Sequence, residues 1–294
     1  MKICSTIGEL NEALKDRKGR VVGFVPTMGA LHRGHISLVN ESISNSDITV
    51  VSIFVNPTQF NNPEDLSKYP RDIEGDSRLL EAAGADIVFI PGVEDIYPGG
   101  VDYSGPIPRS AGSARHVDLN GLDSYGEGPR RPGHFEGVVE VVSRLFDIVK
   151  PQIAFFGEKD FQQLAIIKHF TKELGYKIEI KGCPTFREDD GLAMSSRNLL
   201  LEPQKRRAAP LIYKSLIEAA QIARSAPHPP ITTPELADIT TKKIDSSPEL
   251  KTEYAEIINS LTLQPAESWD EEAITLCVAV YAGKVRLIDN IKLK

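Results

Sequence analysis

Two histidines three residues apart, His32 and His35, stand in the stretch VPTMGALHRGH. The stretch follows an apolar run, and its glycines let the backbone turn sharply and approach a ligand closely. A helix beginning near Gly34 would put both imidazoles on one face, beside N–H groups and a positive dipole end that favour polyphosphate. The alternative is that both rings only make local hydrogen bonds at a helix start. Their position and spacing favour catalysis, with imidazole donors stabilising charge at phosphorus.

A second polar segment, FVNPTQF, ends another apolar run and carries Asn56 and Gln59. Neutral amides bind hydroxyl or carboxylate groups without adding charge. Because Asn-Pro also favours turns, Asn56 has two equal interpretations, a turn residue or a ligand contact. For Gln59 we expect ligand binding.

A third segment, FGEKDFQQL, offers several groups that suit a nucleotide. Gly157 permits a sharp exit from a strand, and Lys159 can meet phosphate as a point charge. Asp160 can cap a helix or hold Mg²⁺, and Gln163 lies on the first turn of that helix. A solvated helix start is the alternative. We expect the segment to face the same sheet edge as the histidines.

Two further segments are rich in donors. REDDGLAMSSRN supplies Ser195, Ser196 and Arg197, which suit the oxygens of a triphosphate, unless the segment is only a polar turn. RRPGHFEG supplies Arg131 and His134, which either reach substrate carboxylates or fix a loop and a helix start. Both interpretations of the second segment stay open. The histidines at 116, 169 and 228 lie outside these motifs and are expected to be surface or core residues.

Short apolar runs alternate with helical patterns in the first part of the chain. The runs are β-branched or aromatic, and several are almost continuously apolar, as buried parallel strands require. The alternation predicts a doubly wound α/β sheet, in which ligands bind beyond the carboxyl ends of the strands. The predicted strands are residues 21–25, 48–55, 86–90, 153–156 and 177–180.

The pattern changes after about residue 186. A polar helix around 202–225, a linker at 226–234 and a helix around 235–245 precede strand-like segments at 253–259, 273–282 and 285–289. This order predicts a second, smaller α+β domain, so that the domains are 1–185 and 186–294. The Gly-, Pro- and Ser-rich residues 99–133 form a long excursion from the first domain.

Composition narrows the class of protein. The chain of 294 residues is 41% hydrophobic and 26% charged, as in ordinary globular proteins. A formal net charge of -7 counts against nucleic acid or an anionic membrane as the main partner. The three scattered cysteines predict buried thiols, without a disulfide framework or a CxxC metal site. No bilayer-length apolar stretch or signal peptide is recognisable, so we expect a cytoplasmic protein.

Taken together, the motifs resemble a known family. The pair H-x-G-H and M-S-S-R resembles the HIGH and KMSKS signatures of the nucleotidyl-transferring superfamily that includes class I aminoacyl-tRNA synthetases. PTMGALHRGH, FVNPTQF, RPGHFEGV, FFGEKDFQQL and DGLAMSSRN are similar to phrases of the pantothenate synthetase family, the pantoate–β-alanine ligases. They occur in that family's order, from about residue 20 to 200.

The resemblance implies a Rossmann-like catalytic domain that binds ATP and pantoate, a C-terminal lid domain and a homodimer. It implies an ATP- and Mg²⁺-dependent reaction in which pantoate is adenylated and β-alanine then displaces AMP, giving pantothenate. His35 matches the residue treated as the family's general acid, and we describe His32 and His35 as donors to phosphorus oxygens. Lys159 and Arg197 would neutralise phosphate charge, and Asp160 would support Mg²⁺.

The resemblance also assigns binding positions. Gln59 matches a position that contacts both pantoate and β-alanine, and Gln163 matches a pantoate contact; Asn56, Arg131 and His134 are further substrate candidates. The ATP positions are Met28, Gly29, Ala30, Leu31, His32, Arg33, Gly34, His35, Gly157, Glu158, Lys159, Asp160, Phe186, Met194, Ser195, Ser196 and Arg197.

The sequence differs from the family pattern at two places, and there are two alternatives to the function that the resemblance implies. Phe186 stands where the family usually has a small β-branched residue, and the stretch from 109 to 130 is longer and more polar than the family's. One rival is another nucleotidyltransferase; a tRNA synthetase would need an RNA-binding module and basic surface, and neither is visible. The other is a catalytically silent nucleotide-binding regulator. The presence of His32, His35, Lys159 and Arg197 counts against it.

Overall fold

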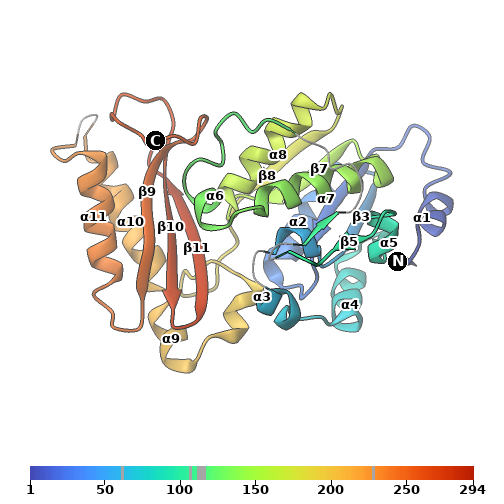
Figure 1. Cartoon of the computed structure of the whole chain (residues 1–294), viewed down its shortest axis with the longest axis horizontal. Coiled ribbons are helices and arrows are strands. Elements are labelled where there is room, and N and C mark those ends of the chain that lie inside the picture. The colour runs from blue at the N-terminus through green and yellow to red at the C-terminus, as the bar shows by residue number, and fades with distance from the viewer. Residues whose placement is uncertain (61–62, 106–107, 111–116, 227–228) are drawn as a thin grey trace. The chain divides into compact units, whose positions relative to one another are not determined.

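The computed structural model describes the chain except residues 61–62, 106–107, 111–116 and 227–228 (Figure 1). His116 and His228 therefore lie outside the described residues. The chain forms two compact units, each built from separate segments. Unit 1 comprises Met1–Leu119, Arg130–Glu158 and Gln163–Pro184, and unit 2 comprises Asn120–Pro129, Lys159–Gln162 and Thr185–Lys294. The predicted domain boundary after residue 185 stays a prediction.

Unit 1 is built on a parallel sheet of six strands in the order β1-β4-β3-β2-β7-β8. Short runs of buried apolar residues form the central strands, which confirms the predicted buried sheet. The strands are β1 (Lys2–Cys4), β2 (Val22–Thr27), β3 (Ile48–Ile53), β4 (Ile87–Phe89), β7 (Ile153–Gly157) and β8 (Glu179–Cys183).

Helices cover both faces of this sheet. Successive side chains of a strand point to opposite faces, and in the central strands those of both faces are buried. On one face, Val25 and Val51 pack in a cluster with Val39 of α2 and Leu80 of α4. On the other face, the ring of Phe24 lies 6.4 Å from that of Phe146 on α7. The helices of unit 1 are α1 (Ile7–Ala13), α2 (Arg33–Asn45), α3 (Pro63–Lys68), α4 (Ile73–Ala83), α5 (Val93–Ile96), α7 (His134–Val149) and most of α8 (Phe161–Glu173).

The strand order reverses between β2 and β7. From β2 the chain proceeds through β3 to β4 on one side, whereas β7 and β8 lie on the other. Such a switch point opens a crevice at the carboxyl ends of the strands, where doubly wound proteins bind ligands. The residues that follow β2 and β7 therefore occupy the edge at which a ligand site is expected.

Most predicted elements are confirmed, and unit 1 and the excursion show three differences. β1 was not predicted, because a three-residue edge strand carries too little pattern to be recognised. The strand expected at 177–180 lies at Glu179–Cys183. The excursion of residues 99–133 contains the strands β5 (Val101–Asp102) and β6 (Arg109–Ser110) and the short helix α6 (Glu127–Arg130).

Unit 2 contains an antiparallel sheet in the order β11-β10-β9, covered by α10 and α11 (Figure 1). Its core joins apolar residues of the strands and the two helices. The predicted helix at 202–225 is interrupted around Ala209 and Pro210 and forms two helices. The elements are α9 (Pro203–Ala208), α10 (Leu211–Arg224), α11 (Thr233–Ile244), β9 (Lys251–Asn259), β10 (Ile274–Ala282) and β11 (Val285–Lys292). Every helix in the described ranges is too short or too polar to span a bilayer.

Helix α7 approaches the chain after β3 very closely at Gly137. That chain forms a short 3₁₀ helix, η1 (Pro57–Gln59). A Cβ atom at Gly137 would lie 2.3 Å from the carbonyl oxygen of Thr58 and 2.8 Å from the amide nitrogen of Gln59. Both are backbone atoms, so only glycine permits this packing.

We expect Gly137→Ala to lower the free energy of unfolding by about 1–3 kcal/mol, because the added methyl group overpacks the helix against η1. Denaturant unfolding would measure the change. Gly8→Ala is the matched control, since Gly8 lies in helix α1 and its nearest Cβ neighbour would be 3.9 Å away. The control should be neutral or stabilise by about 0.5–1 kcal/mol. Equal effects of the two substitutions would contradict the close packing.

Candidate active site

The loop after β2 is held in a conformation that depends on a carboxylate of α4. Gly29 and Ala30 have φ of 80° and 50°. The backbone N–H groups of Ala30 and Leu31 donate to the two carboxylate oxygens of Asp76, at 2.9 and 2.7 Å. A Cβ atom at Gly29 would lie 2.9 Å from Asp76 Oδ2, so the position favours glycine both by φ and by space.

Asp76 is only 3% exposed, and burial raises the pKa of its carboxyl above the ordinary value. The N–H groups of Leu31 and Ala30 oppose this rise because they stabilise the ionised form. Asp76 is a residue that sequence reasoning missed, since no motif joins it to the loop 46 positions away.

His32 and His35 mark the start of α2. His32 is the N-cap residue, and its Nδ1 accepts a hydrogen bond from the N–H of Gly34 at 3.1 Å. The Nδ1 of His35 accepts from the N–H of His32 at 3.3 Å, and the two ring centroids are 4.1 Å apart. A neutral imidazole whose Nδ1 accepts carries its proton on Nε2. In the neutral form, both rings therefore offer an Nε2–H donor at a helix N-terminus, which favours anions.

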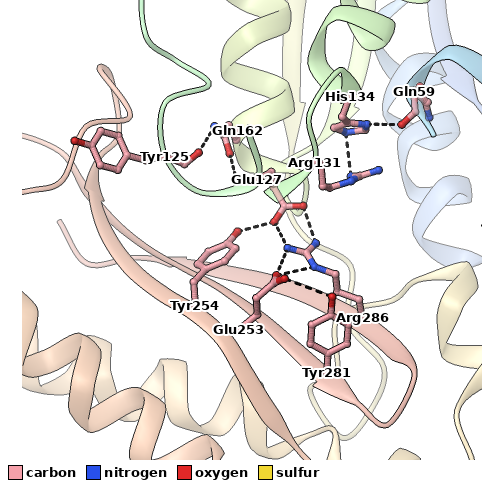
Figure 2. A network of polar contacts seen from close by, with 10 residues as sticks. All are labelled: Gln59, Tyr125, Glu127, Arg131, His134, Gln162, Glu253, Tyr254, Tyr281 and Arg286. Carbon is pink, nitrogen blue, oxygen red and sulfur yellow. Dashed lines mark hydrogen bonds and ion pairs between the residues drawn. The ribbon is translucent and has the colours of Figure 1, made fainter. Parts of the chain in front are cut away.

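Gln59 is held by residues from three segments of unit 1. Its Nε2 donates to the thioether of Met28, which follows β2. Its Oε1 accepts from Nδ2 of Asn56 at 3.4 Å, and its backbone carbonyl accepts from Nδ1 of His134 at 2.9 Å (Figure 2). The exits of β2 and β3 thus meet in the Gln59–Met28 contact.

His134 and Asn56 are both engaged within the protein. His134 is 5% exposed; Arg131 Nη1 lies 3.0 Å from its Nε2, and because arginine can only donate, Nε2 accepts. This favours the interpretation in which His134 fixes a loop and a helix start. Asn56 is 1% exposed and is the N-cap of η1, with its Oδ1 bonded to Tyr97 and Thr58. Direct substrate contact by Asn56, Arg131 or His134 stays a prediction.

The exit of β7 carries the third predicted segment. Gly157 ends the strand, and the N–H of Glu158 donates to the carbonyl of Cys183 on the neighbouring strand at 2.8 Å. Gln163 lies half-buried in the first turn of α8. Lys159 and Asp160 belong to unit 2, where the carbonyl of Lys159 accepts from Nδ2 of Asn290 at 3.0 Å.

In unit 2, residues 186–194 form a tight hairpin. The N–H of Met194 donates to the carbonyl of Phe186 at 3.0 Å, and the turn uses Gly191 with φ of 92°. Ser195 then caps the 3₁₀ helix η2 (Ser196–Leu200), accepting from the N–H of Arg197 at 3.3 Å. The serines and Arg197 therefore start a short helix immediately after the hairpin.

Ion pairs brace this hairpin inside unit 2. Arg187 makes two hydrogen bonds with buried Asp289, at 2.7 and 2.9 Å, and its guanidinium lies 3.4 Å from the ring centroid of Tyr213. Arg206 bridges Glu188 and Asp190 at 2.6 Å each. These contacts fix the hairpin from which the MSSR segment departs.

The segment 120–129 is anchored to the sheet of unit 2 through buried Glu127. Its carboxylate makes two hydrogen bonds with Arg286, at 2.7 and 2.8 Å, and accepts from the hydroxyl of Tyr254 at 2.8 Å (Figure 2). Arg286 also pairs with Glu253 at 2.6 Å, and Gln162 accepts from the N–H of Glu127 at 2.8 Å. Sequence reasoning left this part of the excursion without a role.

Comparison with known proteins agrees with these motifs. The sequence matches the family model of pantoate-beta-alanine ligase over residues 2–292. It is 46% identical over 297 residues to a pantothenate synthetase of Bacteroides thetaiotaomicron, covering 100% of this chain and 99% of the relative. It is 42% identical over 293 residues to one of Acetivibrio thermocellus, covering 99% of each.

Solved structures are also similar. A pantothenate synthetase from Thermus thermophilus has a TM-score of 0.89 and 41% identity, with 100% of this chain and 99% of that chain covered. A pantoate-beta-alanine ligase from Francisella tularensis, complexed with beta-gamma ATP and beta-alanine, has a TM-score of 0.79 and 36% identity, with 100% and 98% covered.

We expect Asp76→Asn to lower the free energy of unfolding by about 1–3 kcal/mol, because one of the two N–H groups of the loop then faces an amide NH₂. Denaturant unfolding would measure the loss. Asp72→Asn is the matched control: Asp72 is the N-cap of the same helix, and asparagine caps as well as aspartate. A loss of the same size in the control would assign the effect to charge rather than to the loop.

Proposed function

The chain belongs to the pantoate–β-alanine ligase family, and from this premise we propose how its own residues perform the reaction. It is an ATP-dependent ligase that condenses pantoate with β-alanine. The observation that carries the residue assignments is the contact of Gln59 with Met28. It joins the segment assigned to ATP and the segment assigned to pantoate within one unit.

The proposed reaction has two steps. The carboxylate of pantoate attacks the α-phosphorus of ATP, the bond from that phosphorus to the bridging oxygen breaks, and pyrophosphate leaves with pantoyl adenylate formed. The amine of β-alanine then attacks the acyl carbon, loses a proton, and expels AMP to give pantothenate. Adenylation turns a poor leaving group into a good one, and the protein contributes by holding two successive nucleophiles in line.

The histidines at the start of α2 are proposed as donors to the reacting phosphate. The Nε2–H groups of His32 and His35 would stabilise charge that develops on phosphorus oxygens and on leaving pyrophosphate. Lys159 and Arg197 would neutralise further phosphate charge. The ATP site is proposed to comprise Met28, Gly29, Ala30, Leu31, His32, Arg33, Gly34, His35, Gly157, Glu158, Lys159, Asp160, Phe186, Met194, Ser195, Ser196 and Arg197.

Gln59 and Gln163 are proposed as the amides that bind pantoate, with Gln59 also contacting β-alanine. Asn56 and His134 would act by holding Gln59, because their polar atoms already meet Gln59 and its neighbours. Arg131 donates to His134 and would thereby help to hold Gln59. It is also the remaining candidate for binding a substrate carboxylate.

Mg²⁺ fits this site as a companion of ATP. Among the residues that the structure describes, no three His, Cys, Asp or Glu side chains gather to hold a metal. Mg²⁺ commonly binds through one or two carboxylates and substrate phosphates, so a closed protein cage is not required. We assign Asp160, which is exposed just before α8, as the carboxylate that would hold it. The bound ion would neutralise phosphate charge.

A homodimeric assembly and a cytoplasmic location are also proposed. Both rest on the family resemblance.

Isotope exchange between ATP and pyrophosphate tests the function. We expect exchange that requires pantoate, and AMP release that additionally requires β-alanine, because the acid must be adenylated before the amine can attack. Exchange without any carboxylic acid, or only with another acid, would sink the assignment. The absence of both activities would favour a silent nucleotide-binding regulator.

His35→Ala should lower the adenylation rate by about 10²–10³-fold, as expected for loss of one donor to a transition-state oxyanion. The same change removes one local hydrogen bond and should cost only about 0.5–1.5 kcal/mol of stability. Single-turnover kinetics and denaturant unfolding would separate the two effects. His169→Ala, at a ring that contacts the carbonyl of Asp118, is the control and should leave the rate unchanged. A small rate effect matching the stability loss would assign His35 to helix capping alone.

A further inference from the structure

Tyr97 is a buried tyrosine of unit 1 that contacts Asn56, which in turn contacts Gln59. Tyr97 follows α5 and is 1% exposed. Its hydroxyl donates to Oδ1 of Asn56 at 2.6 Å and lies 3.1 Å from the hydroxyl of Thr58. None of the motifs recognised in the sequence includes this tyrosine, and the reaction steps do not use it.

The groups around Asn56 fix which way its amide points. Oδ1 receives Tyr97 at 2.6 Å, the hydroxyl of Thr58 at 3.1 Å and the N–H of Thr58 at 3.4 Å. A reversed amide would set its NH₂ group against the N–H of Thr58 and its oxygen against the carbonyl of Gly137, so both of these bonds would be lost. With the amide in this orientation, the hydroxyls of Tyr97 and Thr58 both donate to Oδ1. Nδ2 is thereby directed to the carbonyl of Gly137 at 3.2 Å and to Oε1 of Gln59 at 3.4 Å.

The orientation of the Asn56 amide also sets the orientation of the Gln59 amide. Because its Oε1 meets an amide donor, Nε2 is the end directed to Met28. A thioether is only a weak acceptor, so a substrate oxygen would be a stronger partner for this N–H group. Meanwhile His134 donates to the backbone carbonyl of Gln59 and holds the residue from the other side.

The tyrosine itself is locked in place. The guanidinium of Arg144 lies 5.1 Å from the centroid of its ring, and Arg144 also pairs with buried Glu140 at 3.0 Å on α7. Burial is the main cause that raises the pKa of Tyr97 well above its ordinary value, and the nearby Glu140 raises it further. The hydroxyl therefore keeps its proton, and remains a donor, across the working pH range.

We propose that Tyr97 is a positioning residue that, through Asn56, orients Gln59 so that it presents an N–H donor to an oxygen of pantoate and of β-alanine. The inference rests on the proposed function, in which Gln59 contacts both substrates. With this orientation, Gln59 would select substrates that place a hydroxyl or carboxylate oxygen next to its Nε2. A substrate group that can only donate would face another donor.

Tyr97→Phe removes only the hydroxyl and tests the proposal. We expect KM for pantoate and for β-alanine to rise about 5- to 10-fold, corresponding to the loss of one hydrogen bond, while KM for ATP changes less than about 2-fold. Tyr176→Phe is the matched control. It removes a hydroxyl of the same unit that binds Ser143 and Asp147, and it should leave all three constants within about 2-fold. A Tyr97→Phe enzyme that loses stability but keeps its KM values would reduce Tyr97 to a packing residue.

Thr58→Val provides a second variant in case Tyr97→Phe folds poorly. It removes another donor to Asn56 Oδ1 and should raise the same two KM values in the same direction. Unchanged KM values in Thr58→Val would count against the orientation of the amides.

A readout without substrate separates this proposal from the proposed function. The side-chain NH₂ resonances of Gln59, assigned with a Gln59→Glu sample, should shift in Tyr97→Phe and stay in place in Tyr176→Phe. If the wild type lacks pantoate-dependent exchange, the proposed function fails and this comparison alone decides the positioning role. Resonances that do not respond to Tyr97→Phe would overturn it.

Discussion

Buried polar groups must find partners, and this constraint shapes the carboxyl edge of the unit 1 sheet. The strands themselves are apolar and buried, and several polar side chains near their carboxyl ends are buried as well. Asp76, Asn56 and His134 are each nearly inaccessible, and each meets at least two polar partners. Their hydrogen bonds fix the backbone of the two exits next to which the proposed ligands bind.

The sequence predicted those parts of the fold and site that depend on local pattern. The β2 and β3 strands follow from β-branched runs, and HRGH and FVNPTQF fall at the strand ends as expected. Asp76 and Tyr97 were missed because each acts on a residue more than 40 positions away, at separations of 46 and 41. A lone aspartate on a helix and a lone tyrosine after one carry no signal until the fold brings their partners to them.

The second unit illustrates a different limit. A single boundary near residue 185 follows from the change in composition, whereas segments 120–129 and 159–162, which precede it, belong to unit 2. The first of these segments is anchored by Glu127, which is buried against Arg286 and Tyr254. In sequence Glu127 resembles any solvated glutamate in a polar loop. The pairing with an arginine 159 positions later helps to offset the cost of burying it, and such pairing has no local pattern.

For the histidines at the start of α2, the observed structural role is compatible with the proposed chemical role. Capping uses Nδ1 of both rings, which is the local hydrogen bonding that a purely structural interpretation requires. The same bonds select the tautomer in which Nε2 carries the proton, so capping itself prepares each ring as a donor. Protonating Nδ1 would replace an acceptor by a donor facing a backbone N–H, at the positive end of the helix. The geometry is therefore compatible with the proposed role of the two rings as Nε2–H donors.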